Sequence, residues 1–271
     1  MTRIDCRRIA EAELEQGEEL QLACDSITRQ GYVICDHVVD AHRAAALNDE
    51  FRSRYAAYLE DSERDDTLKV GNRRYMMAIE LAGGFAESEV YANRFVVAVA
   101  RRLLGADAIL ESYGAVVSLS GATQQHLHRD GLQLFDAQLS PLLPCHALTL
   151  AMPLVDMNAT NGSTALWPAS HRWRVRDENV APIAPAIAAG SCLLWDFRLY
   201  HAGAANRSAD HRPMLYATYA RRWYRDPANF TKKGQRRLVY GEKFLAGVPA
   251  DRLRLFGHLP DCPPRAASGH R

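Results

Sequence analysis

An eight-residue stretch, QQHLHRDG at positions 124–131, gathers several side chains that could do chemistry. His128 and Asp130 are two residues apart, so on an extended segment both side chains point to the same side and could reach one metal ion. Two histidines and one carboxylate on a single face are the ligand set of non-haem Fe(II) enzymes. His201, which follows the apolar run SCLLWDF, could be the third ligand. His126 shares the parity of His128 and Asp130 and could also face a metal.

The letters His128-Arg129-Asp130 also spell the HRD of a protein-kinase catalytic loop. That loop requires a leucine directly after the aspartate and an asparagine five positions beyond it. This chain has Gly131 and Phe135 at those positions, and no glycine-rich loop or DFG completes the set. The kinase hypothesis is therefore rejected, whereas a polar loop that does no chemistry stays open.

An arginine eleven residues after His201 is a candidate for binding a carboxylate rather than a metal. Arg212 opens the β-rich run RPMLYATYARR, downstream of the histidine. The planar guanidinium binds both oxygens of a carboxylate at once, so an arginine beside a metal suits the far carboxylate of a bound acid. His-x-Asp alone occurs by chance in many proteins, but its combination with a downstream histidine and arginine is specific.

Composition excludes several classes of partner. The chain has 271 residues, 48% of them hydrophobic and 24% charged, with a formal net charge of +1. Such a balance gives no field that would attract nucleic acid or an acidic membrane. The N-terminus has no apolar run of a signal peptide, and no window approaches the ~18 apolar residues of a membrane span. Six cysteines without a C-x-x-C pair fit a reducing compartment, so we expect a cytoplasmic protein.

The elements that must position these side chains change in type along the chain. Before about residue 105 the pattern predicts mainly helices: a loose one over 8–29, one over 40–60 capped by Asp40, and one over 91–105 that ends at Gly105. Within this part, 31–39 reads as a strand and the charge-rich 62–74 as a polar loop.

Short β-rich runs separated by turn residues follow. These runs predict an antiparallel sandwich or jelly roll, so the fold class is mainly β with flanking helices. We expect one domain over 1–271, with a helical part over about 1–105, a jelly-roll core over about 106–225, and a C-terminal extension over about 226–271 that ends in a frayed tail. The predicted strands lie at 108–120, 146–155, 163–170, 191–197 and 213–223.

With these residues in place, the chain resembles the phytanoyl-CoA dioxygenase-like (PhyH) family of Fe(II)/2-oxoglutarate oxygenases from about residue 30 to about 225. The run GYVICDHVVDAHRAAAL near the N-terminus is similar to the family's opening strand and helix. One departure is Pro-Ala-Ser-His at 168–171, where the family often has Pro-Gly-Ser-His. The other matching features are Gln125-x-x-His128-x-Asp130, Asn161-Gly162-Ser163-Thr164 leading to 168–171, and His201 with Arg212 behind it.

The resemblance implies a double-stranded β-helix, which is a cupin-like jelly roll. It implies that His128, Asp130 and His201 bind Fe(II), and that no further catalytic residue is needed. 2-Oxoglutarate would chelate the metal, with Arg212 on its far carboxylate and Gln125 and Thr164 beside it. Dioxygen would take the last open position, and the products would be succinate, CO₂ and an oxidised substrate.

Asp130 also bears on the type of oxidation. Related halogenases have glycine or alanine at this position, so its carboxylate favours hydroxylation, desaturation, epoxidation or ring formation over halogenation. No basic cluster stands out that would suit coenzyme A, which favours a free small molecule, for example a natural-product intermediate. Arg73 and Arg74, before Tyr75, could meet a substrate anion, but a solvated surface pair is the favoured interpretation. The side chains expected to line the substrate pocket are Met76, Phe135, Tyr200 and Trp223.

Two other classes of function remain open beside the oxygenase. A cupin-type metal enzyme that uses no 2-oxoglutarate would not need Arg212. A catalytically silent binding module could keep the barrel, although such proteins usually lose a metal ligand.

Overall fold

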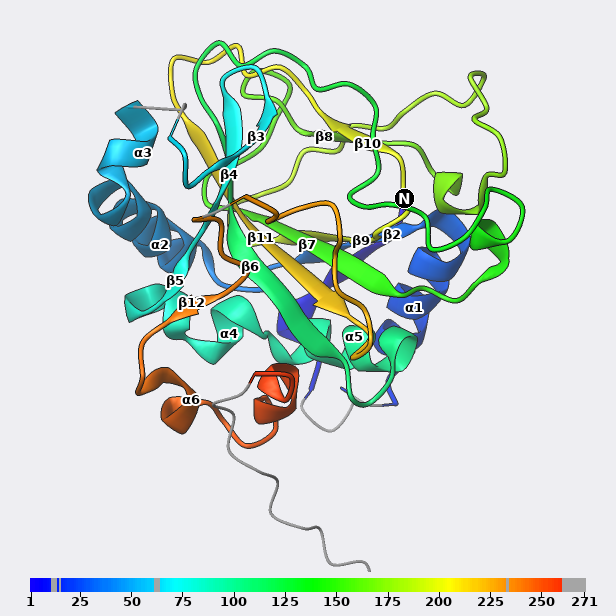
Figure 1. The fold of residues 1–271 in the computed structure, drawn as a ribbon, viewed down its shortest axis with the longest axis horizontal. Coiled ribbons are helices and arrows are strands. Elements are labelled where there is room, and N and C mark those ends of the chain that lie inside the picture. The colour runs from blue at the N-terminus through cyan, green and yellow to red at the C-terminus, as the bar shows by residue number, and fades with distance from the viewer. Residues whose placement is uncertain (11–13, 15, 61–63, 233, 260–271) are drawn as a thin grey trace, which may run out of the picture.

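The protein is described by a computed structural model that covers residues 1–10, 14, 16–60, 64–232 and 234–259 (Figure 1). Its centre is an eight-stranded mixed sheet in the order β1-β2-β9-β7-β11-β6-β4-β3. All neighbours in this sheet are antiparallel except β1 and β2. The strands are β1 (Arg3–Asp5), β2 (Tyr32–Asp36), β3 (Leu68–Gly71), β4 (Arg74–Ala78), β6 (Ile109–Ser118), β7 (Ala147–Pro153), β9 (Cys192–Asp196) and β11 (Arg212–Ala220).

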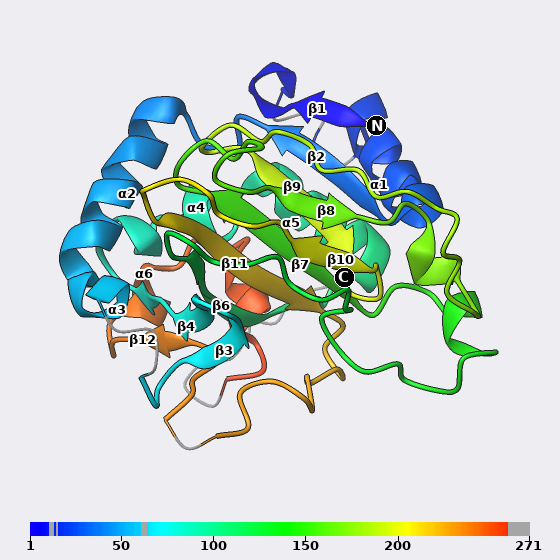
Figure 2. The same cartoon turned by 90° about the horizontal axis from the view of Figure 1, so that it is seen from above.

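A smaller layer lies over one face of the large sheet (Figure 2). Its centre is the antiparallel pair β8 (Thr164–Leu166) and β10 (His201–Gly203). Single bridges extend this pair on both sides, from His128 to His201 and from Leu166 to Ile183. Two layers of antiparallel strands form the jelly roll that the sequence predicts, so that prediction is confirmed.

Several of the helices lie on the other face of the large sheet, below it in Figure 1. A further two-stranded parallel pair, β5 (Glu80–Leu81) and β12 (Val239–Tyr240), lies near them. Among the described residues, no helix is both long and apolar enough to cross a membrane. The α-helices are α1 (Glu18–Gln30), α2 (Ala41–Arg54), α3 (Ala56–Glu60), α4 (Ser88–Tyr91), α5 (Arg94–Leu104) and α6 (Phe244–Gly247). The 3-10 helices are Cys6–Arg8, Gly83–Ala86, Ser140–Leu142, Ser170–Arg172 and Leu253–Phe256.

Alternation along the strands divides the interior into two cores. Successive residues of a strand point to opposite faces. Thus Leu150 and Leu194 pack against the helices in the larger core. Ala151 and Trp195, their neighbours in sequence, face the smaller β8–β10 layer. The large sheet is therefore buried on both faces, and the chemistry lies between the two sheets.

Several local predictions are confirmed by backbone contacts. The carboxylate of Asp40 accepts a hydrogen bond from the backbone N–H of Arg43 and begins α2. Gly105 ends α5 with a φ of 107°, which a glycine adopts without steric cost. The strand expected over 31–39 is β2, and the five later strands expected from the sequence are β6, β7, β8, β9 and β11.

Other expectations for the N-terminal part are wrong. Four of its strands join the large sheet, β1 and β2 at one edge and β4 and β3 at the other. The segment 62–74 is not simply a polar loop, because β3 and β4 form a hairpin within it and beyond it. Edge strands are short and carry polar side chains, so β3 has too few apolar residues to stand out in the sequence. Helix α1 begins only at Glu18, and residues 11–13, 15 and 260–271 lie outside the described residues, including the expected C-terminal tail.

Candidate metal centre

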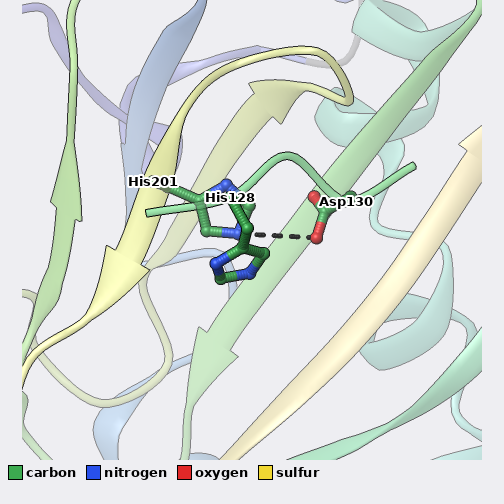
Figure 3. A group of neighbouring side chains, drawn as sticks. All are labelled: His128, Asp130 and His201. Atoms are coloured by element: carbon green, nitrogen blue, oxygen red, sulfur yellow. Dashed lines mark ion pairs between the residues drawn. The ribbon is translucent and has the colours of Figure 1, made fainter. Parts of the chain in front are cut away.

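The three predicted ligands lie together between the two sheets. The candidate ligand atoms of His128, Asp130 and His201 are all within 4.8 Å of one another (Figure 3). The Nε2 of His201 is 3.4 Å from Oδ1 of Asp130. Backbone hydrogen bonds tie the two histidines across the bridge, N to O at 3.0 Å and at 2.9 Å. His126 lies beside His128, with ring centroids 5.4 Å apart, but is not part of this ligand group.

Hydrogen bonds to the rings leave one nitrogen of each histidine ready for a metal. The Nδ1 of His128 is 2.9 Å from the carbonyl of His126, and the Nδ1 of His201 is 3.0 Å from the carbonyl of Leu199. Each carbonyl accepts a hydrogen bond from Nδ1–H, so a metal would bind at Nε2. Burial lowers the pKa of His201, but the Asp130 carboxylate raises it more, so its Nε2 would give up a proton when a metal binds. Burial lowers the pKa of His128 to about 4, which keeps this ring neutral. The donor set fits Fe(II) bound by two imidazoles and one carboxylate.

The carboxylate of Asp130 is held by three donors from the large sheet. Oδ2 accepts from Thr149 Oγ1 at 2.6 Å and Trp195 Nε1 at 2.8 Å, and Oδ1 accepts from the Tyr216 hydroxyl at 2.5 Å. Burial raises the pKa of Asp130, but the charge of His201 and these hydrogen bonds lower it more, to about 2. The group is thus an anion with a fixed orientation, as a metal ligand must be.

Removing one of these donors should loosen the metal. In Tyr216→Phe the ring is kept and only the hydrogen bond to Asp130 is lost, so we expect metal affinity to fall by about tenfold or more. Tyr219→Phe is the matched control, because its hydroxyl donates to the carbonyl of Tyr91 on the helical side of the same strand. Competition with a fluorescent chelator measures both variants, and equal affinities would contradict the role of Tyr216.

Two buried arginines face the cavity that contains the ligands, which has a volume of about 310 Å³. Arg212 on β11 and Arg74 on β4 are the cross-strand partners of the same residue, Ser118, from opposite sides of β6. Each is 1% exposed. Burial lowers the pKa of Arg74 to about 10, and burial with the charge of Arg74 lowers that of Arg212 to about 9.

The two guanidiniums have unused donors. Nε and Nη1 of Arg74 and Nε of Arg212 are buried without a hydrogen-bond partner, and within the described part of the chain neither group pairs with a carboxylate. Two buried cations without a counter-charge are costly unless an anion binds between them. The expectation that Arg74 is a solvated surface residue is therefore wrong, because its place opposite Ser118 turns it into the cavity. Only the pairing of β4 with β6 reveals this.

The remaining predicted cosubstrate residues border the same end of the cavity. Gln125 and Thr164 both line it. Gln125 is fixed by donation of Nε2 to the carbonyl of Val70 at 2.5 Å and by acceptance from the backbone N–H of Gly203 at 2.8 Å. Thr164 lies directly opposite Gly203 in the β8–β10 pair. An acid bound by these residues would thus lie between the two arginines, Arg212 and Arg74, and the metal ligands.

Gly203 leaves the space that Arg74 occupies. A Cβ at this position would overlap Nη1 of Arg74 and lie 2.6 Å from Oε1 of Gln125. We therefore expect Gly203→Ala to raise the KM for 2-oxoglutarate by about tenfold or more while the fold is kept. Gly247→Ala is the control, since its Cβ would meet nothing within 4 Å. An unchanged KM in steady-state assays of succinate release would show that Arg74 does not contact the cosubstrate.

Only one of the four residues expected to line the substrate pocket does so. Met76 lines the cavity from β4. Phe135 and Trp223 are 57% and 63% exposed and lie elsewhere. Tyr200 directly precedes His201 in an extended segment, so it points to the opposite side, where the guanidinium of Arg129 lies 4.1 Å from its ring centroid. Parity relative to the ligand could have excluded Tyr200 from the sequence alone.

Comparison with known proteins finds relatives in sequence and in fold. A protein similar in sequence is dioxygenase af480 from Aspergillus fumigatus, 28% identical over 152 residues, which are 54% of this chain and 48% of that protein. Dioxygenase trt7 from Aspergillus terreus is 31% identical over 136 residues, which are 47% of each chain. The chain thus spans about half the length of the curated relatives it matches.

A solved structure with the same fold is that of the epimerase SnoN in complex with Fe³⁺, alpha-ketoglutarate and nogalamycin RO. The TM-score is 0.59 at 19% sequence identity, and the match covers 86% of this chain and 96% of SnoN. The family model described as phytanoyl-CoA dioxygenase (PhyH) matches residues 27–214, which is more than half of the chain. The chain belongs to the phytanoyl-CoA dioxygenase family.

Proposed function

We propose that the protein is a non-haem Fe(II)- and 2-oxoglutarate-dependent dioxygenase that oxidises a C–H bond of a small molecule. The observation that carries this proposal is the joint position of His128, Asp130 and His201 in one cavity with two buried arginines that have no carboxylate partner among the described residues. Three ligands on one face leave open positions on the metal, and a dianion such as 2-oxoglutarate would offset the charges of Arg74 and Arg212.

In this proposal the iron and 2-oxoglutarate, when bound, supply the oxidising chemistry, in which 2-oxoglutarate and O₂ become succinate and CO₂ as the substrate is oxidised. The residues of the chain bind and orient. Arg212 and Arg74 hold carboxylate oxygens through planar, paired donors. Gln125, fixed on both sides of its amide, and Thr164 border the acid. Asp130 stays ionised and keeps its orientation through the donors on its two oxygens.

The substrate class is proposed as a natural-product intermediate. Support comes from the relatives: SnoN was crystallised with nogalamycin RO, and the two fungal relatives are named dioxygenases.

The proposal is tested by incubating the purified protein with Fe(II), 2-oxoglutarate, O₂ and a panel of polycyclic natural products. We expect succinate to form in step with a substrate mass change of +16 or −2. Succinate in the absence of any substrate would measure uncoupled turnover and serve as the baseline. A product that forms equally well without 2-oxoglutarate would instead support a cupin-type enzyme, and a protein that binds neither Fe(II) nor 2-oxoglutarate would support a silent binding module.

A further inference from the structure

The cavity continues past the metal centre, away from the two arginines. Four alternate residues of β11 line it: Arg212, Met214, Tyr216 and Thr218. A strand rises about 3.4 Å per residue, so Arg212 lies about 14 Å before Tyr216 and Thr218 about 7 Å after it. Since the Tyr216 hydroxyl contacts Asp130, the metal centre lies between the arginine end and the Thr218 end.

A pair of hydroxyl side chains closes this second end. Ser112 on β6 is the direct cross-strand partner of Thr218, so the two side chains are neighbours on the cavity face. They are 1% and 4% exposed, and both line the cavity. The Ser112 hydroxyl is buried without any hydrogen-bond partner among the described residues. A buried hydroxyl is normally paired, so one without a partner that faces a cavity indicates a ligand atom that pairs with it.

A β-bulge next to this pair shapes the end of the cavity. The register shifts after Thr218, which leaves Glu111 as an extra residue on β6. Bulges re-aim side chains beside functional sites. Here the carboxylate of Glu111 pairs with Arg237, whose Nη2 also donates to the carbonyl of Asp226 at 2.6 Å. These bonds tie the segment 226–230, which lines the cavity and forms its roof, to the strand that carries Ser112.

The charged side chain of this roof, Asp226, already accepts hydrogen bonds from the protein itself. Oδ1 of Asp226 accepts from the backbone N–H groups of Ala228 and Asn229, at 2.9 and 3.2 Å. Its Oδ2 accepts from Nδ2 of Asn229 at 2.6 Å, and the same amide donates to the carbonyl of Asp130 at 3.0 Å. The roof therefore offers a ligand neither an unpaired acid nor an unpaired base.

The other walls of this end are apolar. Phe197 and Phe230 line the cavity here, whereas Val116 and Met76 lie in register with Met214 and line it nearer the arginines. Arg129 also lines the cavity; its guanidinium lies over the ring of Tyr200, and its Nε is buried without a hydrogen-bond partner among the described residues. An uncharged, largely apolar molecule would fit these walls, and its single polar group would meet the hydroxyl pair.

We propose that Ser112 and Thr218 bind a hydroxyl or carbonyl oxygen of an uncharged, largely apolar substrate. This inference rests on the proposed function, because it places that oxygen on the far side of the metal from the 2-oxoglutarate end. Thr218 lies two strand residues, roughly 7 Å, from Tyr216, whose hydroxyl contacts Asp130. The hydroxyl pair would thus select which C–H bond faces the metal centre.

The test uses three probes that share one apolar cage: adamantan-1-ol, adamantane-1-carboxylate and protonated 1-aminoadamantane. The full chain is loaded with Zn(II) and 2-oxoglutarate to prevent turnover, and each probe is titrated by isothermal calorimetry. We expect adamantan-1-ol to bind at least about tenfold more tightly than either ion. The double variant Ser112→Ala/Thr218→Val should lose about tenfold of the affinity for the alcohol and leave that for the ions unchanged.

A matched double variant, Ser53→Ala/Thr160→Val, changes two exposed residues outside the cavity and should bind the alcohol as the wild type does. The inference is overturned if adamantan-1-ol binds no better than the ions, undetectable binding included, or if the cavity variant keeps its affinity. 2-Oxoglutarate is titrated first, so its failure to bind would count against the proposed function. The probe titration on the Zn(II)-loaded chain alone would still decide the role of the hydroxyl pair.

Discussion

Asp130→Ala is expected to abolish both metal binding and succinate formation. The substitution removes the anionic ligand of the group, and it leaves Thr149, Trp195 and Tyr216 with donors that face an empty space. Two neutral imidazoles alone hold Fe(II) weakly, so we expect metal affinity to fall by more than about a hundredfold. Equilibrium dialysis with metal analysis measures the loss, and succinate release in the presence of excess Fe(II) measures its effect on turnover.

Asp130→Asn separates the charge from the shape of this ligand. The amide has nearly the size of the carboxylate but cannot accept hydrogen bonds on both arms, so it should also lose the metal while it disturbs packing less. Thermal unfolding of both variants, without metal, shows whether the fold is kept. If Asp130→Ala retained wild-type metal affinity and succinate formation, the assignment of the metal centre would be wrong.

The second large effect is expected at the two buried arginines. We expect Arg212→Met and Arg74→Met each to weaken 2-oxoglutarate binding by about a hundredfold or more, because each removes a charged donor from a site shielded from water. Calorimetric titration of 2-oxoglutarate into the Zn(II)-loaded protein measures the dissociation constant. Arg73→Met is the control, since Arg73 is adjacent in sequence but donates to the carbonyl of Ser120 at the surface.

In the absence of 2-oxoglutarate, the same variants should not destabilise the protein. Removal of a buried cation that has no counter-charge should leave the free energy of unfolding unchanged or increase it. A variant that binds 2-oxoglutarate poorly and yet unfolds at the same or a higher temperature would exclude simple misfolding. Wild-type affinity in Arg74→Met, with loss in Arg212→Met, would assign Arg74 to a different anion.

The sequence alone was sufficient for those residues that a local pattern of spacing identifies. His128 and Asp130 share one face of an extended segment, and the arginine that follows His201 opens a strand, so spacing alone brought them into one hypothesis. The jelly roll followed from short strands between turn residues. Asp40 and Gly105 were readable as helix boundaries because capping depends on local backbone geometry.

What the sequence did not predict depends on strand pairing. Arg74 looked like half of a surface pair, and only the register of β4 against β6 shows that it faces the cavity beside Arg212. The orientation of Phe135 and Trp223 toward solvent likewise depends on loops that carry no periodic pattern. Ser112 is an ordinary serine in an apolar run, and a single unpaired hydroxyl becomes visible only when its surroundings are known.

The backbone bridge between His128 and His201 has a consequence for assembly of the holoprotein. Two main-chain hydrogen bonds hold these residues together, and carbonyls orient both rings. The entropy of bringing the ligands together is therefore lost when the chain folds, rather than when the metal arrives. We therefore expect a chelator to empty the site and leave the jelly roll folded, which thermal unfolding before and after chelation would measure. Reloading with Co(II) or Ni(II) would then require no refolding.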